Sequence, residues 1–431
     1  MSAAVAPAWQ RLVGKGPWGR GGTFGVLDIG TAKLCCMIAR PRQGRGIELL
    51  GRGYQLAEGL KAGEIVDAES AEASVLATLH EAEQQAGEVL REIVVSMSGG
   101  RPQSSYVRVA LPLQGRAVTE PDLALLLDRA RRAVATPERE VVHAMPLEIT
   151  IDDGRPLRDP CGMTGQKLEI VAHLVTVAGP MLRNILACLE RCHIEVRGVV
   201  CSSYAGGFAC LAEDEIERGC LVLDLGGGTT GIAHFAGGGL VLLDQVPYGG
   251  DHVTGDLAYG LSTSRAHAER IKNLYGSVQH RSCDDSTRIE VPTVEDEDGV
   301  PLGEVPRTRV TEIVLARIEE IMRMVQHRLR EHDELLAARP PRSVVLTGGG
   351  CQIEAIEELV QDMFGLPARR GLPASLIGAK EGDRSPCCAA ATGSLGLTLG
   401  DDGGLGWSQQ LEVSFLSGRL ARLGRWFREN F

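Results

Sequence analysis

Residues 25–33 read GVLDIGTAK and residues 221–231 read LVLDLGGGTTG. Each stretch is an apolar run that carries one aspartate, Asp28 or Asp224, and then turns through glycine to threonine. This pattern predicts a buried strand, a tight glycine turn and a second strand. Because the two copies lie far apart along the chain, they predict two related α/β halves that each open with the same hairpin.

A third glycine cluster follows another apolar run, in SVVLTGGG at residues 343–350. We expect a strand at 344–346, a turn at 348–350 and then a helix. The apolar positions Ile353, Ile356, Leu359, Val360 and Met363 recur at helical spacing, so they predict one buried helix face.

The chain between the two hairpins contains a unit that breaks the repeat. Residues 98–178 contain a strand-like run, a helix-like run and two further strand-like runs, so we expect a compact α/β unit inserted into the first half. Residues 277–310 are polar, acidic and interrupted by proline, which predicts loops around one strand, and 311–336 follow helical spacing. The expected division is described by the following ranges: a disordered segment at 1–21, with a short amphipathic segment as the alternative; a first half at 22–97, 179–215 and 385–399; the insert at 98–178; a second half at 216–384 with an outer subdomain at 259–335; a linker at 400–413; and a helix at 414–431.

Composition narrows the class of protein. The chain has 431 residues and a net charge of −11, which gives no sign of nucleic-acid binding. None of its 12 cysteines forms a CxxC pair, so we expect reduced cysteines used as small apolar residues in the cytosol rather than a disulfide or zinc framework. No apolar run is long enough to predict a transmembrane helix, and the N-terminus carries no apolar stretch typical of a secretory signal.

The glycine turns predict phosphate binding. Glycine lets backbone N–H groups approach an anion closely, and successive N–H groups form an anion nest. A carboxylate would repel phosphate directly, so Asp28 and Asp224 are expected to orient water around a bridging Mg²⁺, and Asp224 is also the candidate that polarises an attacking water. The other candidates are Gly30, Thr31, Ala32, Lys33, Gly226, Gly227, Gly228, Thr229 and Thr230 for phosphate, and Gly348, Gly349 and Gly350 for the nucleoside.

The order of these three loops resembles the ATPase superfamily of actin and the heat-shock chaperones. Within it, the chain resembles the FtsA family of bacterial cell-division proteins from about residue 22 to its end. The stretches that carry the resemblance include IVVSMSGG (93–100), VPYGGDHVTGDLA (246–258), AERIKNLYG (268–276), WFRENF (426–431) and the insert itself. The resemblance implies an actin-like fold of two ribonuclease-H-like halves with an inserted α/β subdomain. It also implies nucleotide contacts by Gly249 and Gly250 and by Glu269 and Lys272; the alternative for the latter two is an exposed ion pair.

The same resemblance implies a function. It predicts ATP and Mg²⁺ binding, self-association into actin-like filaments, and tethering of FtsZ to the cytoplasmic face of the inner membrane at the septum. The insert would receive later division proteins. The outer subdomain would bind the FtsZ C-terminal peptide, with Arg265, Lys272 and Arg317 as candidates against the alternative of a solvated helix face. No general base or arginine finger is evident, so hydrolysis is expected to be slow. The rival readings are a small-molecule kinase, a PilM-like pilus adaptor and an MreB-like filament protein.

The tail predicts a membrane contact. On a helical wheel Leu416, Leu420, Leu423, Phe427 and Phe431 fall within an arc of about 80°. Arg422, Arg425 and Arg428 lie opposite, and Trp426 flanks the arc. This distribution is typical of an interfacial helix on anionic lipid; a terminal helix packed on its own protein is the alternative. One short helix binds modestly, so several copies on a filament would strengthen attachment.

Overall fold

The two predicted hairpins each begin a five-stranded sheet, and the two sheets have the same strand order. The computed structural model describes residues 22–42, 46–281, 284–292 and 303–399. The N-terminal segment 1–21, the linker at 400–413 and the amphipathic helix at 414–431 lie outside this part of the chain. The strands of the first sheet, in spatial order, are β3 (Ile47–Leu56), β2 (Lys33–Pro41), β1 (Phe24–Ile29), β6 (Glu92–Met97) and β10 (Glu195–Cys201).

The second sheet repeats this arrangement. In each sheet the first three strands along the chain form an antiparallel meander. Two later strands then add in parallel on the free side of the strand that begins the meander. The strands of the second sheet, in order, are β13 (Gly239–Val246), β12 (Thr230–Ala236), β11 (Cys220–Leu225), β16 (Ser343–Thr347) and β17 (Ala368–Arg370). The duplicated α/β fold predicted from the two hairpins is therefore confirmed.

Helices cover both sheets and also fill the space between them. The inward residues of the second sheet, such as Val222 and Phe235, belong to the same buried cluster as the first sheet, whereas Leu221 and Leu223 face a second cluster. This alternation follows from the two-residue period of a strand. The helices of the first half are α2 (Ala68–Ala86), α4 (Gly179–Arg191), α5 (Ser202–Cys210) and α12 (Ala389–Leu399), with the short strands β4 (Leu60–Lys61) and β5 (Glu64–Ile65).

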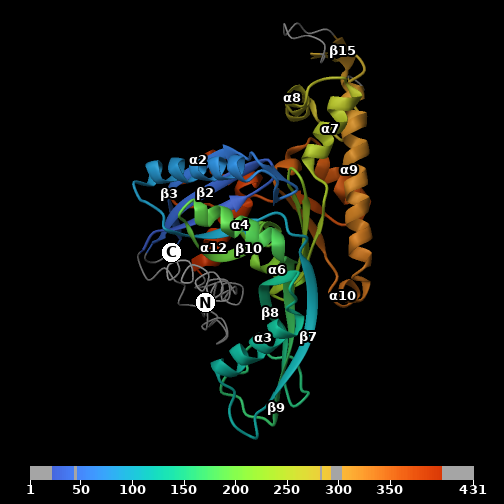
Figure 1. The fold of residues 1–431 in the computed structure, drawn as a ribbon. Coiled ribbons are helices and arrows are strands. Elements are labelled where there is room, and N and C mark those ends of the chain that lie inside the picture. The colour runs from blue at the N-terminus through green and yellow to red at the C-terminus, as the bar shows by residue number, and fades with distance from the viewer. Residues whose placement is uncertain (1–21, 43–45, 282–283, 293–302, 400–431) are drawn as a thin grey trace.

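The second half carries the outer subdomain, which lies at the top of Figure 1. Two corrections to the sequence reading arise here. The 277–310 region forms a two-stranded hairpin rather than one strand, and the long helix begins at Arg307, before the expected 311. The helices and strands of the second half outside its five-stranded sheet are α6 (Glu213–Arg218), α7 (Gly250–Gly260), α8 (Arg265–Tyr275), β14 (Arg288–Val291), β15 (Gly303–Pro306), α9 (Arg307–Arg330), α10 (Asp333–Ala338) and α11 (Ile356–Phe364).

The inserted unit projects from the opposite end of the molecule, at the bottom of Figure 1. Its three strands pair in the order β7-β9-β8 and α3 packs on them, with a separate apolar cluster that includes Leu123, Leu126 and Leu174. At the start of α3 the Asp122 carboxylate accepts from the Thr119 backbone N–H at 2.8 Å and from the Thr119 hydroxyl at 2.7 Å. The elements are β7 (Gln103–Pro112), α3 (Glu120–Val134), β8 (Arg139–Ile151) and β9 (Lys167–Ala178).

Candidate nucleotide-binding cleft

The two glycine turns have the same geometry. Gly30 N donates to the carbonyl of Lys33 at 3.1 Å, and Gly226 N donates to the carbonyl of Thr229 at 2.9 Å. Each bond closes the tight turn of its hairpin, and each aspartate lies two residues before the first turn glycine. The repeat seen in the sequence is therefore also a repeat of backbone hydrogen bonds.

The tips of the two hairpins meet. A Cβ added at Gly227 would lie 2.9 Å from Ala32 Cβ, and one added at Gly228 would lie 2.6 Å from Thr31 Oγ1. Such an approach is open only to glycine. The structure thus brings together two groups of predicted phosphate-binding residues that the sequence separates widely.

The third glycine loop lies against the second hairpin. Gly348 has a φ of +80°, and a Cβ there would lie 2.5 Å from Oδ1 of Asp224. A Cβ at Gly350 would lie 3.0 Å from Leu225 Cβ. A short 3₁₀ turn occupies 349–352, and α11 begins only at Ile356. Ile353, which we expected on the face of this helix, therefore precedes it. The backbone before α11 is instead held by Gly276, whose carbonyl accepts from Glu354 N at 3.3 Å.

Asp28 and Asp224 share one electrostatic environment. Burial raises the pKa of Asp28, although hydrogen bonds from Ser96 and Ser202 and the charge of Lys33 oppose the shift. Burial, followed by repulsion from Asp28, raises the pKa of Asp224 to about 7. Two carboxyl groups in this state favour a cation between them, because a cation stabilises the ionised form that burial disfavours.

Lys33 supplies the positive charge at this site. Its ammonium group donates to the carbonyl oxygen of Cys387 and lies 5.6 Å from the centre of the Tyr54 ring. Burial lowers the pKa of Lys33, but the surrounding groups, Cys387 first, outweigh burial and raise it above its ordinary value. Lys33 therefore stays charged beside Asp28.

The three threonines differ in what their hydroxyls bind. Thr229 Oγ1 donates to the Ser98 carbonyl at 3.0 Å, and Thr230 Oγ1 donates to the Tyr248 carbonyl at 2.8 Å. These two hydroxyls, which we expected to reach phosphate, hold the hairpin in place instead. Thr31 Oγ1 is buried and has no hydrogen-bond partner within the described ranges, so it is the hydroxyl that can accept a new ligand.

The start of α7 fixes the second hairpin. Gly250 N donates to the Gly226 carbonyl at 2.9 Å, and Asp251 N donates to the Gly227 carbonyl at 2.8 Å. A Cβ at Gly249 would lie 2.4 Å from Gly226 O, which explains glycine at that position. Gly249 and Gly250 are thus beside the phosphate turn, with the Gly250 amide committed to a protein carbonyl.

Glu269 and Lys272 form an ion pair at the edge of the cleft. Lys272 Nζ lies 2.6 Å from Glu269 Oε2, 2.9 Å from Thr254 Oγ1 and 3.3 Å from the Gly250 carbonyl. Burial raises the pKa of Glu269, but hydrogen bonds from Lys272 and Thr254 outweigh it, so the pKa lies below its ordinary value. The ion pair that was the alternative reading is present, and it lies next to the second hairpin through Gly250.

These residues fit a magnesium nucleotide. The cleft has glycine backbone at every close approach, an unpaired buried hydroxyl at Thr31, a lysine, and two carboxyl groups suited to a hydrated cation. Asp28 and Asp224 would hold the water shell of Mg²⁺, and the two turns would hold the phosphates.

Sequence reasoning missed several residues of this cleft. Ser96 pairs in register with Asp28 across β6 and β1, and Tyr54 faces Lys33 from β3. Ser96 could have been found from the pairing of β6 with β1, because the two strands run in parallel and the pairing places Ser96 beside Asp28. No local motif marks Tyr54.

The candidate cations of the outer subdomain have partners within the chain. Arg317 Nη2 lies 3.0 Å from Asp256 Oδ1, and Arg265 Nη2 lies 3.3 Å from the Asp251 carbonyl. Lys272 is engaged with Glu269. Of these three side chains, Arg265 makes the longest hydrogen bond.

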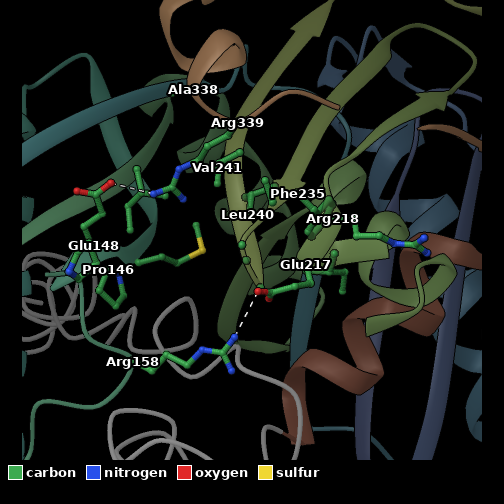
Figure 2. Close-up of a pocket in the computed structure, with 18 of the residues that line it drawn as sticks. Pro146, Glu148, Arg158, Glu217, Arg218, Phe235, Leu240, Val241, Ala338 and Arg339 are labelled. Carbon is green, nitrogen blue, oxygen red and sulfur yellow. Dashed lines mark hydrogen bonds and ion pairs between the residues drawn. The ribbon is translucent and has the colours of Figure 1, made fainter. Parts of the chain in front are cut away.

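A cavity lies apart from the cleft, where the insert meets both halves (Figure 2). Its volume is about 620 Å³, and its walls include Pro146, Phe235 and Leu240. Figure 2 shows two ion pairs at its edges: Arg339 Nη2 to Glu148 Oε1 at 3.0 Å, and Arg158 Nη2 to Glu217 Oε1 at 3.3 Å.

All the cysteines in the part of the chain that the structure describes are free thiols, and only Cys161 and Cys387 among them are partly exposed. In that part, histidine, cysteine and acidic residues form no cluster suited to a metal ion. The helices there include none with the length and apolar character needed to cross a bilayer.

Comparison with solved structures defines the class of protein. A PilM–PilN type IV pilus biogenesis complex matches with a TM-score of 0.61 at 16% identity, covering 87% of this chain and 97% of that one. MreB5 of Spiroplasma citri bound to ADP matches with a TM-score of 0.53 at 14% identity, covering 87% and 95%. The chain therefore has the actin-like fold.

Sequence comparison then defines the family. The family model described as cell division protein FtsA matches residues 221–393, and that of the SHS2 domain inserted in FtsA matches 99–176. The cell division protein FtsA of Rhizobium meliloti is 35% identical, with 96% of each chain covered, and that of Escherichia coli K12 is 28% identical, with 94% and 97% covered. This chain belongs to the FtsA family of cell-division proteins.

Proposed function

We propose that this FtsA-family chain binds ATP with Mg²⁺ in the cleft between its two halves and uses the nucleotide chiefly to control assembly. The observation that carries the proposal is the meeting of the two hairpins with the third glycine loop at Asp224. Hydrolysis would be slow, since the cleft offers Asp224 but no arginine directed at the phosphate turns from the residues discussed above. Binding of a fluorescent ATP analogue, competed by ATP and dependent on Mg²⁺, tests this; absence of competable binding would refute it.

The chain would link FtsZ filaments to the inner membrane at the division septum, acting as a peripheral protein that forms actin-like polymers. The outer subdomain at 259–335 would bind the FtsZ C-terminal peptide, and the helix at 414–431 would bind anionic lipid. What supports this is the family membership together with the amphipathic tail pattern.

The membrane step has a charge-matched test. We expect Trp426→Glu/Phe427→Glu to abolish co-sedimentation with anionic vesicles, because both changes fall on or beside the apolar arc. Ser414→Glu/Ala421→Glu adds the same charge on the arginine side of the wheel, opposite the apolar arc, and should weaken sedimentation less. Equal sedimentation of the wild type and the Trp426/Phe427 variant would reject the anchor.

The inserted unit would recruit later division proteins. The cavity beside β8 supports this proposal, because it combines apolar walls with charged edges and so suits an extended segment of a partner. Charge reversal by Glu148→Arg, with Arg339→Glu as the compensating change, would test it. Recruitment that does not change with either substitution would place the partner elsewhere.

A further inference from the structure

A small cavity lies beside the second phosphate hairpin, where the two halves meet. Its volume is about 10 Å³, which is room for a single water molecule. The polar residues that line it are Ser98, Ser203, Asp224, Thr229 and Gln245. It is therefore a polar cavity of the kind that holds water rather than an empty apolar void.

The orientation of Gln245 is fixed by its surroundings. Its side-chain nitrogen lies 2.8 Å from the carbonyl oxygen of Ser98. A carbonyl only accepts hydrogen bonds, so Nε2 must face Ser98 and Oε1 must face away from it. That Oε1 atom is buried and has no hydrogen-bond partner within the described ranges.

The same carbonyl ties Gln245 to the phosphate hairpin. Ser98 O also accepts from Thr229 Oγ1 at 3.0 Å. Gln245 on β13 and Thr229 of the hairpin therefore share the Ser98 carbonyl, which directly follows β6 of the first half. The amide of Gln245 cannot turn without breaking a contact between the halves.

Glycine at position 231 keeps the cavity open to Asp224. A Cβ there would lie 2.6 Å from Ser203 Cβ and 3.5 Å from Asp224 Cβ. The absence of a side chain lets α5 approach β12 and leaves Asp224 beside the space. Asp28 and Lys33 are the charged groups that act on Asp224 from the first half.

A water molecule satisfies this arrangement. An unpaired buried acceptor such as Gln245 Oε1 destabilises the folded state, and a bound water removes that cost. Water has two protons, so one can go to Gln245 Oε1 and the other to the Asp224 carboxylate. Both lone pairs of the water oxygen then remain free.

We propose that this cavity holds one water molecule between Gln245 Oε1 and Asp224, and that Gln245 orients it for slow hydrolysis of the bound nucleoside triphosphate. In that step the water oxygen forms a bond to phosphorus, the bond from phosphorus to the bridging oxygen breaks, and the water proton passes to Asp224. The products are a nucleoside diphosphate and inorganic phosphate. The inference rests on the proposed nucleotide binding.

The test compares Gln245→Leu with Gln326→Leu. Gln326 also donates its amide to a carbonyl, that of Met363 at 2.7 Å, but on α9 away from the cavity. We expect Gln245→Leu to lower ATP turnover at least about tenfold with the dissociation constant for the nucleotide changed less than about twofold, and Gln326→Leu to change neither. Equal turnover in the two variants, or no hydrolysis by wild-type protein that binds ATP, would overturn the inference. Absence of ATP binding by the wild type would instead refute the proposed function.

Discussion

Ser104 Oγ on β7 lies 2.8 Å from the backbone nitrogen of Leu243 on β13 and 3.0 Å from its carbonyl oxygen. The hydroxyl accepts from the Leu243 N–H and lies beside the carbonyl, whereas its single proton goes to His173 Nε2 on β9. Tyr106, two residues along the same strand, donates to the Val241 carbonyl at 2.7 Å. The edge of the insert is attached to the second half by side chains rather than by a strand ladder.

Ser104→Ala should therefore loosen the insert. We expect a loss of roughly 1–2 kcal/mol in the free energy of unfolding, because the Leu243 N–H loses its acceptor in a part-buried position. Ser105→Ala is the matched control, since alternation along the strand turns Ser105 to the other face. Urea denaturation measures both, and equal losses would show that the Ser104 contact contributes nothing.

Acid should destabilise the protein through His173. Its Nδ1 lies 3.1 Å from the Leu240 carbonyl and must donate to it, so in the neutral ring Nε2 accepts from Ser104 at 2.8 Å. Burial lowers the pKa of His173 to about 4. The unfolded chain binds this proton near pH 6.5 and the folded chain only near pH 4, so stability is retained above pH 6.5 and falls by roughly 3 kcal/mol on acidification through that window. His173→Gln should flatten this part of the pH profile, whereas His80→Gln, at an exposed position, should leave it as in the wild type.

Gly348→Ala should impair nucleotide binding. The new methyl group would fall against Oδ1 of Asp224, and the positive φ would strain alanine in addition. We expect the affinity for the magnesium nucleotide to fall at least about tenfold, measured by titration calorimetry. Gly382→Ala is the control, because a Cβ there meets nothing within 4 Å. If the two variants bind equally, the third glycine loop is not part of the binding site.

Arg265→Glu tests the FtsZ-peptide surface. Arg265 has one 3.3 Å contact to a backbone carbonyl, so its charge can be reversed with little loss of stability. We expect at least fivefold weaker binding of the FtsZ C-terminal peptide, measured by fluorescence anisotropy at low salt. Arg132→Glu on α3 of the insert controls for net charge, and equal weakening by both would point to non-specific attraction.

The sequence predicted the hairpins, the third loop and the insert because each depends on local pattern. Glycine after an apolar run requires a turn, and strand alternation requires a buried face, so Gly30 and Gly226 could be placed without a structure. The partners of the functional groups depend on the packing of distant segments. Ser96 beside Asp28, and Ser98 between Thr229 and Gln245, follow from the order of strands in the sheets and from the contact of the two halves, which no local motif encodes. For the same reason the thiol-rich turn at Cys387, whose carbonyl holds Lys33, could not be foreseen.

The position of α12 has a mechanical consequence. A Cβ at Gly393 would lie 1.8 Å from the Ala205 carbonyl, so this helix is pressed directly onto α5 of the first half. The tail that follows residue 399 therefore extends from the first half, whereas the outer subdomain belongs to the second. Under the proposed function, a pull between membrane and FtsZ would load the two halves against each other, with the phosphate hairpins on the line of force. Optical-trap pulling between the tail and Tyr259 on α7, with and without ATP, would show whether nucleotide raises the force at which the halves separate.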